Sequence, residues 1–315
     1  MPSPNISIII PVKPGGRVRA LEALEGIDYP RDRMEIIVAE GSCPSRQRNR
    51  AAAEATGEII YFLDDDSMAG PDFLIRAVAH FADPRVAAVG GPSLTPQTDT
   101  PFQQACGAAL ASLFGGGGVR NRYRKSGSVR ITADNELILC NLSLRRDVFL
   151  DFGGLDERLY PNEENELMAR LKSAGWQLVH DPNLAVCRSQ RPTFGAFVRQ
   201  LHTYGRGRAE QTLISGRVSP ASLIPPLFIM YLCLLPFVQN PVYTLPLLCY
   251  AGAVLLTAVW ESFRMRRWAL FPRLVLLLPT LHLAYGAGMI RGMVSPRYRH
   301  NQLRSDEVVL RRILS

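Results

Sequence analysis

Three long apolar stretches in the last third of the chain decide what it can fold into. They cover residues 222–238, 242–260 and 274–290, and they carry no charged residue apart from the titratable His282. Each is near the length of about 20 residues that an α-helix needs to cross a bilayer. The alternative is the hydrophobic helical core of a soluble domain, which uninterrupted runs of this length do not favour. We therefore predict a membrane region after a soluble first part.

Basic residues surround these stretches, and the formal net charge of the 315 residues is +8. Arginines gather on both sides of the third stretch: Arg264, Arg266, Arg267, Arg273, Arg291, Arg297, Arg299, Arg304, Arg311 and Arg312. The positive-inside rule places segment 264–273 in the cytosol, which agrees with two preceding spans and a cytosolic N-terminal domain. If the third stretch also crosses, the basic tail lies outside, against the rule. A re-entrant or interfacial helix, interrupted by Pro279, Gly286 and Gly288, is equally compatible.

The N-terminus and the cysteines indicate the compartment of the soluble part. No basic segment followed by an apolar one precedes the first strand, so we expect no signal peptide. The six cysteines show no CxxC spacing, which fits a reducing compartment without a zinc site or a disulfide framework. No nucleic-acid motif accompanies the basic charge, so membrane lipids and not nucleic acid are the expected partners. The predicted location is the inner (plasma) membrane, with several spans and a cytosolic N-terminal domain.

Short apolar runs alternate with helical patterns in the first 90 residues. Expected strands are residues 6–12, 35–39, 59–63 and 86–89, and expected helices are residues 17–24, 45–55 and 72–81. Alternation at this spacing predicts a Rossmann-like α/β domain with a mostly parallel sheet and right-handed crossovers. Neither the dinucleotide fingerprint GxGxxG nor the phosphate loop GxxxxGK[ST] follows the first strand.

The pattern is less regular after the fourth strand. Four consecutive glycines at 115–118 predict a flexible break, and the basic segment 120–130 predicts a mobile loop. Strand character returns at 137–141, and helices are expected at 163–174 and 194–214. The last of these is amphipathic, carries arginines and leads into the apolar stretches, so we expect it to lie along the membrane surface.

Asp64, Asp65 and Asp66 directly follow the third expected strand. Three carboxylates where a buried strand emerges are costly unless a cation meets them. Ligands of open α/β sheets bind at such strand ends, and carboxylates there suit a hard divalent ion that also holds a diphosphate. A solvated acidic turn that caps the helix after Pro71 is the other interpretation, and the triplet alone does not decide between them.

Motifs from the first strand onwards occur in a defined order. They are SIIIPV at 7–12, EIIV at 35–38, RN at 48–49, Ala53, GEII at 57–60, FLDDD at 62–66, GGLDE at 153–157, EENEL at 163–167, Arg170 and GW at 175–176. This succession resembles the family 2 inverting glycosyltransferases, which have a GT-A fold, and it covers about residues 5–215. Segments 199–200 and 204–208, followed by apolar stretches, resemble the membrane-bound members that build exopolysaccharide repeat units on lipid carriers, the succinoglycan type.

The resemblance implies a donor site. Pro11 and Lys13 match the end of the first nucleotide-binding strand, and Glu40 matches the acid that usually contacts the base, where the family mostly has Asp-Asp. Asp64 and Asp66 match the DxD motif. Asp64 would face the ribose or the diphosphate, and Asp66 would ligate Mg²⁺ or Mn²⁺. The full expected donor-binding set is Pro11, Lys13, Glu40, Arg48, Asp64 and Asp65. Arg48 is equally compatible with a solvated helix charge.

Glu163 and Glu164 match the Glu-Asp pair of the family, whose second member is the catalytic base. We therefore assign Glu164 as the base, and Glu163 is the alternative because glutamate reaches further than aspartate. A base must be ionised to take the proton of an acceptor hydroxyl, and the positive end of a helix dipole favours this. Ordinary acids at a helix N-terminus are the other interpretation.

Asn141, Gln200 and Arg206 are expected near the acceptor or the diphosphate. A hydrogen-bonded core asparagine is equally compatible with Asn141, and lipid head groups are equally suitable partners for Arg206. Gln200 and the segment around Arg206 loosely resemble the QxxRW element of processive relatives. The tryptophan is missing, which argues against a processive, cellulose-synthase-like enzyme.

The predicted function is metal-dependent transfer of a sugar from a nucleotide-diphosphate sugar to a lipid-linked or glycan acceptor, with a polyprenyl-linked acceptor favoured. A catalytically silent membrane scaffold and a sugar nucleotidyltransferase are the alternatives. The scaffold does not account for the retained acids, and the nucleotidyltransferase does not account for the Glu163 region. The expected organisation is a GT-A domain at 1–215 that ends in an amphipathic helix at about 192–215, a membrane region at 216–292 with segments at about 222–239, 242–260 and 272–290, and a basic tail at 293–315.

Overall fold

A computed structural model describes residues 3–299 and 307–313 of the chain. The chain forms two compact units. The first, which we call the sheet unit, comprises Met1–Leu94, Asn121–Arg188 and Leu303–Ser315. The second, the helical unit, comprises Thr95–Arg120 and Ser189–Gln302. Both units are therefore assembled from segments that are distant in the sequence.

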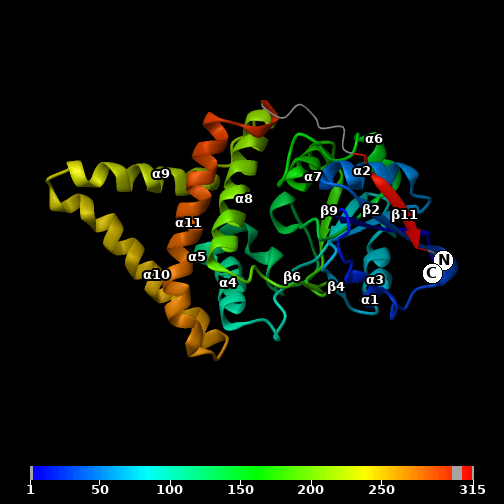
Figure 1. Ribbon diagram of the computed structural model, residues 1–315, viewed down its shortest axis with the longest axis horizontal. Helices are drawn as coiled ribbons and strands as arrows, with labels where there is room; N and C mark the ends of the chain where they lie inside the picture. Colours follow the sequence, from blue (N-terminus) through cyan, green and yellow to red (C-terminus); the bar gives the residue numbers. More distant parts are fainter. Residues whose placement is uncertain (1–2, 300–306, 314–315) are drawn as a thin grey trace. The chain divides into compact units, whose positions relative to one another are not determined.

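The sheet unit is built on a sheet in the order β11-β2-β1-β3-β8-β5-β9-β7 (Figure 1). Its strands are β1 (Ile6–Val12), β2 (Met34–Glu40), β3 (Ile59–Leu63), β5 (Val86–Gly90), β7 (Arg130–Ile131), β8 (Asn141–Arg145), β9 (Gln177–His180) and β11 (Val309–Ile313). Strand β1 pairs in parallel with β2 and β3, and β5 pairs in parallel with β9. Strands β7, β8 and β11 pair antiparallel with their neighbours. The predicted α/β fold with its central parallel strands is confirmed, and the complete sheet is mixed.

Apolar side chains cover both faces of this sheet, as expected when helices pack on either side. Successive residues of a strand point to opposite faces, so Ile8 and Ile10 of β1 belong to one core cluster and Ile9 to the other. The helices of the unit are α1 (Ala20–Leu24), α2 (Pro44–Glu54), α3 (Phe73–His80), α6 (Arg146–Asp151) and α7 (Glu163–Ser173). A smaller sheet has the order β4 (Met68–Ala69), β10 (Val186–Cys187) and β6 (Ser93–Leu94). Helices α1 and α3 contribute to the first cluster, and α2, α6 and α7 to the second.

Strand β11 comes from the segment expected as a basic tail. Its residues pair with β2 from Val309 opposite Glu40 to Ile313 opposite Ile36. Leu310 packs against the second core cluster, and the guanidinium of Arg312 lies 2.7 Å from the carboxylate of Glu35. The sequence analysis did not predict this strand.

The helical unit contains α4 (Pro101–Ala111), α5 (Leu113–Gly116), α8 (Phe194–Ser215), α9 (Pro220–Leu234), α10 (Leu245–Arg264) and α11 (Phe271–Val294). Helices α8 and α11 lie side by side, α9 extends away from them, and α10 returns to α11 (Figure 1). In the described part of the chain, three segments are long and apolar enough to cross a membrane: Pro220–Phe237, Pro241–Arg264 and Trp268–Arg299. The predicted apolar segments are thus confirmed as helices of spanning length.

The flexible break predicted at the four glycines is wrong. Gly115 and Gly116 belong to α5, and the 3₁₀ helix Gly117–Arg122 follows. A Cβ atom on Gly115 would lie 2.3 Å from the carbonyl oxygen of Ala109, and one on Gly116 would lie 1.9 Å from that of Leu110. The glycines therefore allow two consecutive turns to pack closely. The strand predicted at 137–141 instead begins at Asn141.

Candidate active site

The ends of three parallel strands place the predicted donor-binding residues at one edge of the sheet. Strands β1, β2 and β3 run in the same direction, with Pro11 opposite Ala39 at the end of the β1–β2 ladder. Glu40 is the last residue of β2, and its carboxylate accepts a hydrogen bond of 3.0 Å from the backbone N–H of Gly15. Lys13 is exposed in the loop that follows β1. This edge is where ligands of open α/β sheets bind.

Two arginines meet the aspartate triplet that follows β3. The guanidinium of Arg48, from α2, lies 2.6 Å from Oδ1 of Asp64. The guanidinium of Arg188, which follows β10, lies 3.1 Å from Oδ2 of Asp64 and 2.6 Å from Oδ1 of Asp66. Asp65 lies between Asp64 and Asp66 in the sequence. Burial, and then the negative charges of Asp66 and Asp64, raise the pKa of Asp65. The two outer aspartates of the triplet are therefore ion-paired, and the triplet is not a fully solvated acidic turn.

Glu163 opens α7 and is buried, with 3% of its side chain exposed. Its Oε1 lies 3.8 Å from the guanidinium of Arg48, and its Oε2 has no hydrogen-bond partner among the described residues. Burial, and then the negative charge of Glu164, raise the pKa of Glu163 to about 8 against the opposing effect of Arg48. The environment of Glu163 therefore favours its protonated form.

Glu164 has a different environment. Its Oε1 lies 3.3 Å from the guanidinium of Arg122, which is itself buried. Arg122 also donates to the side chain of Asn165 and to the backbone carbonyl oxygens of Asp134 and Asn135 at 2.5 and 3.0 Å. Because these contacts hold the side chain of Arg122 in place, they also fix the position of its positive charge relative to the carboxylate of Glu164. The two adjacent glutamates thus have different environments: burial and Glu164 raise the pKa of Glu163, and Glu164 is paired with Arg122.

Arg48 connects the acids after β3 with those at the start of α7. Its side chain is 5% exposed and touches both Asp64 and Glu163. Arginine suits such a position because its planar guanidinium can bind two carboxylates and stays charged when buried. The donor edge and the predicted base region are therefore one network.

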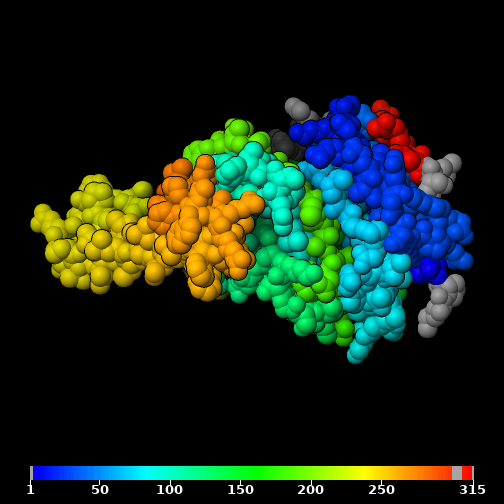
Figure 2. All heavy atoms as spheres, turned by 90° about the horizontal axis from the view of Figure 1, so that it is seen from below, coloured from blue at the N-terminus to red at the C-terminus, as the bar shows by residue number. Residues whose placement is uncertain are grey.

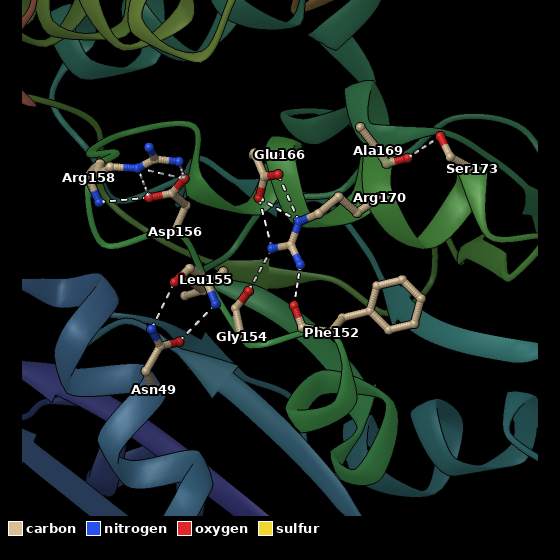
Figure 3. Close-up of polar contacts among 10 residues, drawn as sticks. All are labelled: Asn49, Phe152, Gly154, Leu155, Asp156, Arg158, Glu166, Ala169, Arg170 and Ser173. Atoms are coloured by element: carbon tan, nitrogen blue, oxygen red, sulfur yellow. Dashed lines mark hydrogen bonds and ion pairs between the residues drawn. The ribbon is translucent and has the colours of Figure 1, made fainter. Parts of the chain in front are cut away.

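A second network holds the loop that leads into α7 (Figure 3). The guanidinium of Arg170 binds the carboxylate of Glu166 at 2.7 Å, one turn away in α7, and donates to the carbonyl oxygens of Phe152 and Gly154. Asn49 of α2 donates to the carbonyl of Leu155 at 2.8 Å and accepts from its N–H at 2.9 Å. These contacts explain the positions of the RN and GGLDE motifs, because they fix the loop and α7 against α2.

Asn141 is at the start of β8 and is fully buried. Its side-chain oxygen accepts a hydrogen bond of 2.7 Å from the hydroxyl of Tyr61. Its side-chain nitrogen donates to the carbonyl oxygens of Leu184 and Pro92 at 2.7 and 3.3 Å. This is the hydrogen-bonded core asparagine that the sequence left open, and its amide is satisfied by the protein itself.

Gln200 and Arg206 belong to α8 of the helical unit. Gln200 donates to the hydroxyl of Tyr204 at 2.9 Å. Arg206 donates to the carbonyl oxygen of Ser295 at 2.7 Å and lies 3.3 Å from the carboxylate of Glu210. The predicted site residues thus fall into two sets, one in each unit.

The chemistry of the triplet fits a hard divalent cation. Asp64 and Asp66 already converge on one positive group, the guanidinium of Arg188. Among the described residues, no group of three or more His, Cys, Asp or Glu side chains is arranged to hold a metal ion. Mg²⁺ and Mn²⁺ are commonly bound by one or two carboxylates that substrate phosphates and water complete, so two aspartates are a sufficient protein contribution.

Arg122 and Arg188 were missed by the sequence analysis. Each is separated from its acidic partner by more than 40 positions, and neither belongs to a motif. A count of charges near the predicted acids would have shown that Arg48 alone cannot balance them. The count would not have identified these two among the 36 lysines and arginines of the chain.

Comparison with known families decides the class of the protein. The model of glycosyl transferase family group 2 matches residues 59–289, from β3 into α11. The chain belongs to this family. The glycosyltransferase is therefore an enzyme of a family in which inversion is typical, and the prediction of a family 2 glycosyltransferase is confirmed.

Curated relatives of this glycosyltransferase agree with that assignment. Succinoglycan biosynthesis protein ExoA of Rhizobium meliloti (strain 1021) is 26% identical over 294 residues, which are 84% of this chain and 87% of the relative. Glycosyltransferase AglE of Haloferax volcanii is 23% identical over 237 residues, which are 66% of this chain and 74% of the relative. Among solved structures, mannosyltransferase PcManGT from Pyrobaculum calidifontis has a TM-score of 0.57 at 16% identity and covers 92% of this chain and 87% of its own. That likeness supports the GT-A fold.

Proposed function

We propose that this glycosyltransferase is metal-dependent and inverting, and that it moves a sugar from a nucleotide-diphosphate sugar to a membrane-associated, polyprenyl-linked acceptor in polysaccharide or glycan synthesis. The observation that carries the proposal is the contact of Arg48 with both Asp64 and Glu163. It brings the donor edge and the start of α7 into one network. The apolar helices and the printed role of ExoA in succinoglycan biosynthesis support an acceptor at the membrane.

Asp66, together with Asp64, would hold Mg²⁺ or Mn²⁺. The bound ion would offset the negative charge that develops on the departing diphosphate. PcManGT, which has the same fold, is solved with GDP-Man and Mn²⁺. Pro11, Lys13 and Glu40 would line the nucleotide, and the N–H of Gly15 orients the carboxylate of Glu40.

Glu164 takes the proton of the acceptor hydroxyl in a single displacement, which inverts the configuration of the sugar carbon. Arg122 orients this carboxylate through an ion pair of 3.3 Å. Glu163 stays protonated next to it, which avoids two adjacent buried negative charges. This division between two neighbouring acids follows the general rule that different environments assign different roles to paired carboxyl groups.

The proposed organisation has a cytosolic catalytic domain at 1–215, a membrane region at 216–292 and a basic segment at 293–315, of which residues 309–313 return to the sheet unit as β11. The proposed location is the inner (plasma) membrane. Gln200 and Arg206, close to the membrane segments, would contact the acceptor or its diphosphate. Asn141 supports the donor edge from the core.

A donor screen tests this function. The purified full chain is incubated with Mn²⁺, a lipid extract and single nucleotide sugars, and release of nucleoside diphosphate is measured together with sugar in the lipid fraction. We expect one donor class to give release that a chelator abolishes, and a product of inverted anomeric configuration by NMR. Release of nucleoside diphosphate from none of the donors would contradict the proposal.

Matched variants test the residues. Asp66→Ala and Glu164→Gln should each lower transfer by at least about 100-fold, the range expected for loss of a general base, and should leave membrane insertion intact. Asp28→Ala and Glu25→Gln, at exposed positions of the sheet unit, are the controls and should keep full transfer. Full transfer by the Glu164→Gln enzyme would remove Glu164 as the base.

A further inference from the structure

We propose that the chain crosses the membrane twice, as a hairpin of α9 and α10, and that α11 does not cross but lies at the cytosolic face together with α8 and α4. The inference rests on the proposed membrane location. It specifies which of the apolar helices enter the lipid and which have the composition of a membrane span but do not cross.

The first argument is the return of the chain to the sheet. Strand β2 precedes all apolar helices in sequence, and β11 follows them, yet the two strands are hydrogen-bonded neighbours over residues 309–313. Strands of one sheet lie on the same side of a membrane. The segment between them must therefore cross an even number of times. In the described part of that segment three helices have spanning length, so at least one of them does not cross.

The second argument is the contact between α11 and α8. A Cβ atom on Gly288 would lie 2.0 Å from the carbonyl oxygen of His202, and one on Gly205 would lie 1.9 Å from that of Tyr285. The two backbones therefore touch, and the second half of α11 follows α8 along its length. The pairing continues beyond the end of α11, where Arg297 binds the carboxylate of Glu210 at 2.6 Å.

Helix α8 is too polar to accompany a span through lipid. It carries Arg199, Arg206, Arg208 and Glu210. Arg199 is exposed, and a charged side chain in contact with the bilayer centre is strongly unfavourable. Helix α8 is not among the segments apolar enough to cross. The second half of α11 consequently lies at the depth of an interfacial helix, where charged residues reach water and head groups.

The third argument fixes the first half of α11. Segment 95–120, which contains α4 and α5, leaves the sheet unit after Leu94 and returns to it at Asn121. Its 26 residues are too few for two crossings, which need about 40. The imidazole Nε2 of His282 lies 2.9 Å from the carbonyl oxygen of Phe114 in this segment. The middle of α11 is therefore attached to a segment that does not cross, and the Nδ1 of the same imidazole lies 2.8 Å from the hydroxyl of Tyr250 near the start of α10.

Helices α9 and α10 differ from α11 in exposure. In the most apolar 18 residues of Pro220–Phe237, none is buried. The buried share is 11% in the same stretch of Pro241–Arg264 and 39% in that of Trp268–Arg299. At about 1.5 Å per residue the first two reach roughly 27 and 36 Å, which matches a hydrocarbon core of about 30 Å. Exposed apolar side chains run along both helices: Ile224, Leu227, Met230, Leu234, Leu248, Leu255, Leu256 and Val259. In Figure 2 the yellow atoms of α9 and the start of α10 extend from one side of the helical unit, and α9 packs on α11 where a Cβ atom on Gly286 would lie 2.8 Å from the backbone of Pro225. A lipid bilayer is the partner that fits this surface.

The charges on the loops agree with this choice. With α9 and α10 crossing, segment 238–240 faces outside and carries no charge. The basic segment 264–273 and the arginines after position 290 then all face the cytosol, as the positive-inside rule requires. Crossing by α10 and α11 instead would place segment 264–273 outside. Three crossings would place the basic tail outside, against the positive-inside rule, and two crossings by α9 and α10 avoid this conflict.

Cysteine labelling in membrane vesicles tests the topology. The four cysteines that are not buried, Cys43, Cys187, Cys233 and Cys249, are replaced by alanine, and single cysteines are introduced at exposed positions: Gln239→Cys, Arg267→Cys, Arg299→Cys and Ser128→Cys. An impermeant maleimide is applied to right-side-out and inside-out vesicles. The cysteine at 239 should react only from outside. Those at 128, 267 and 299 should react only from inside, and the background protein should not react.

Three results would overturn the inference or its basis, and they differ from one another. Labelling at 299 on the side opposite to 128 means an odd number of crossings and refutes the inference. Labelling at 239 from the inside means that the hairpin does not cross, and also refutes it. Recovery of the full chain in the soluble fraction refutes the membrane location on which the inference rests. Sugar transfer is measured separately, so that loss of the membrane location is distinguished from loss of the proposed activity.

Discussion

Replacing Glu163 by glutamine should change how stability depends on pH, because the buried environment of this side chain raises its pKa. Burial and the neighbouring Glu164 raise the pKa of Glu163 from 4.5 to about 8, although Arg48 opposes the shift. At about 1.4 kcal/mol per pKa unit, the folded protein disfavours the ionised form by about 5 kcal/mol. Glutamine has nearly the same shape and cannot ionise, so it removes this effect.

The sign of this pH dependence follows from a comparison of the folded and the unfolded chain. Below pH 4.5 the carboxyl group of Glu163 is protonated in both the folded and the unfolded chain, and its full contribution to stability is present. Between pH 4.5 and pH 8 only the unfolded chain loses the proton, so the free energy of unfolding falls as the pH rises. The stability of the Glu163→Gln variant relative to the natural chain should therefore increase from pH 5 to pH 8.5.

Thermal unfolding of the full chain in nanodiscs, followed by circular dichroism between pH 5 and pH 9, measures this difference. Each kcal/mol corresponds to about 2–4 °C in Tm for a domain of this size, so Glu163→Gln should gain on the order of 10 °C across the range. The exposed Glu25→Gln variant is the control and should follow the natural chain at every pH. A difference between Glu163→Gln and the natural chain that stays constant from pH 5 to pH 9 would refute the reasoning, since Glu163 would then not titrate in this window.

Three further substitutions have definite expected outcomes. Arg188→Gln removes the cation between the two outer aspartates of the triplet, so Mn²⁺ should bind several-fold more tightly without donor; calorimetry that shows unchanged affinity would contradict this. Asn141→Leu leaves the hydroxyl of Tyr61 unpaired in the core and should cost about 2–3 kcal/mol of unfolding free energy, measured by denaturant titration; a loss below about 0.5 kcal/mol would argue against the network. Gly288→Val forces α8 and α11 apart and should lower Tm, whereas Gly252→Val, at a position with open space, should not; equal effects would disprove the close contact.

Local patterns in the sequence predicted most of the elements. The apolar runs that became β1, β2 and β3 are short and rich in β-branched residues, and the run length alone identified the three apolar helices. The order of the motifs predicted the family and placed the aspartate triplet at a strand end. Each of these strands, helices and motifs consists of residues close together in the chain, so no tertiary information is needed to identify it.

Only the tertiary structure decided which charges meet and which helices pack against one another. Nothing in residues 309–313 indicates that they pair with β2, yet in the proposed topology this pairing allows only an even number of crossings. Arg122 and Arg188 reach their acids across large sequence separations, and Glu163 and Glu164 differ only through what surrounds them. The physical reason is that burial and charge pairing depend on distance in space. The sequence by itself determined the elements and the family, and the fold decided the environment of each acid.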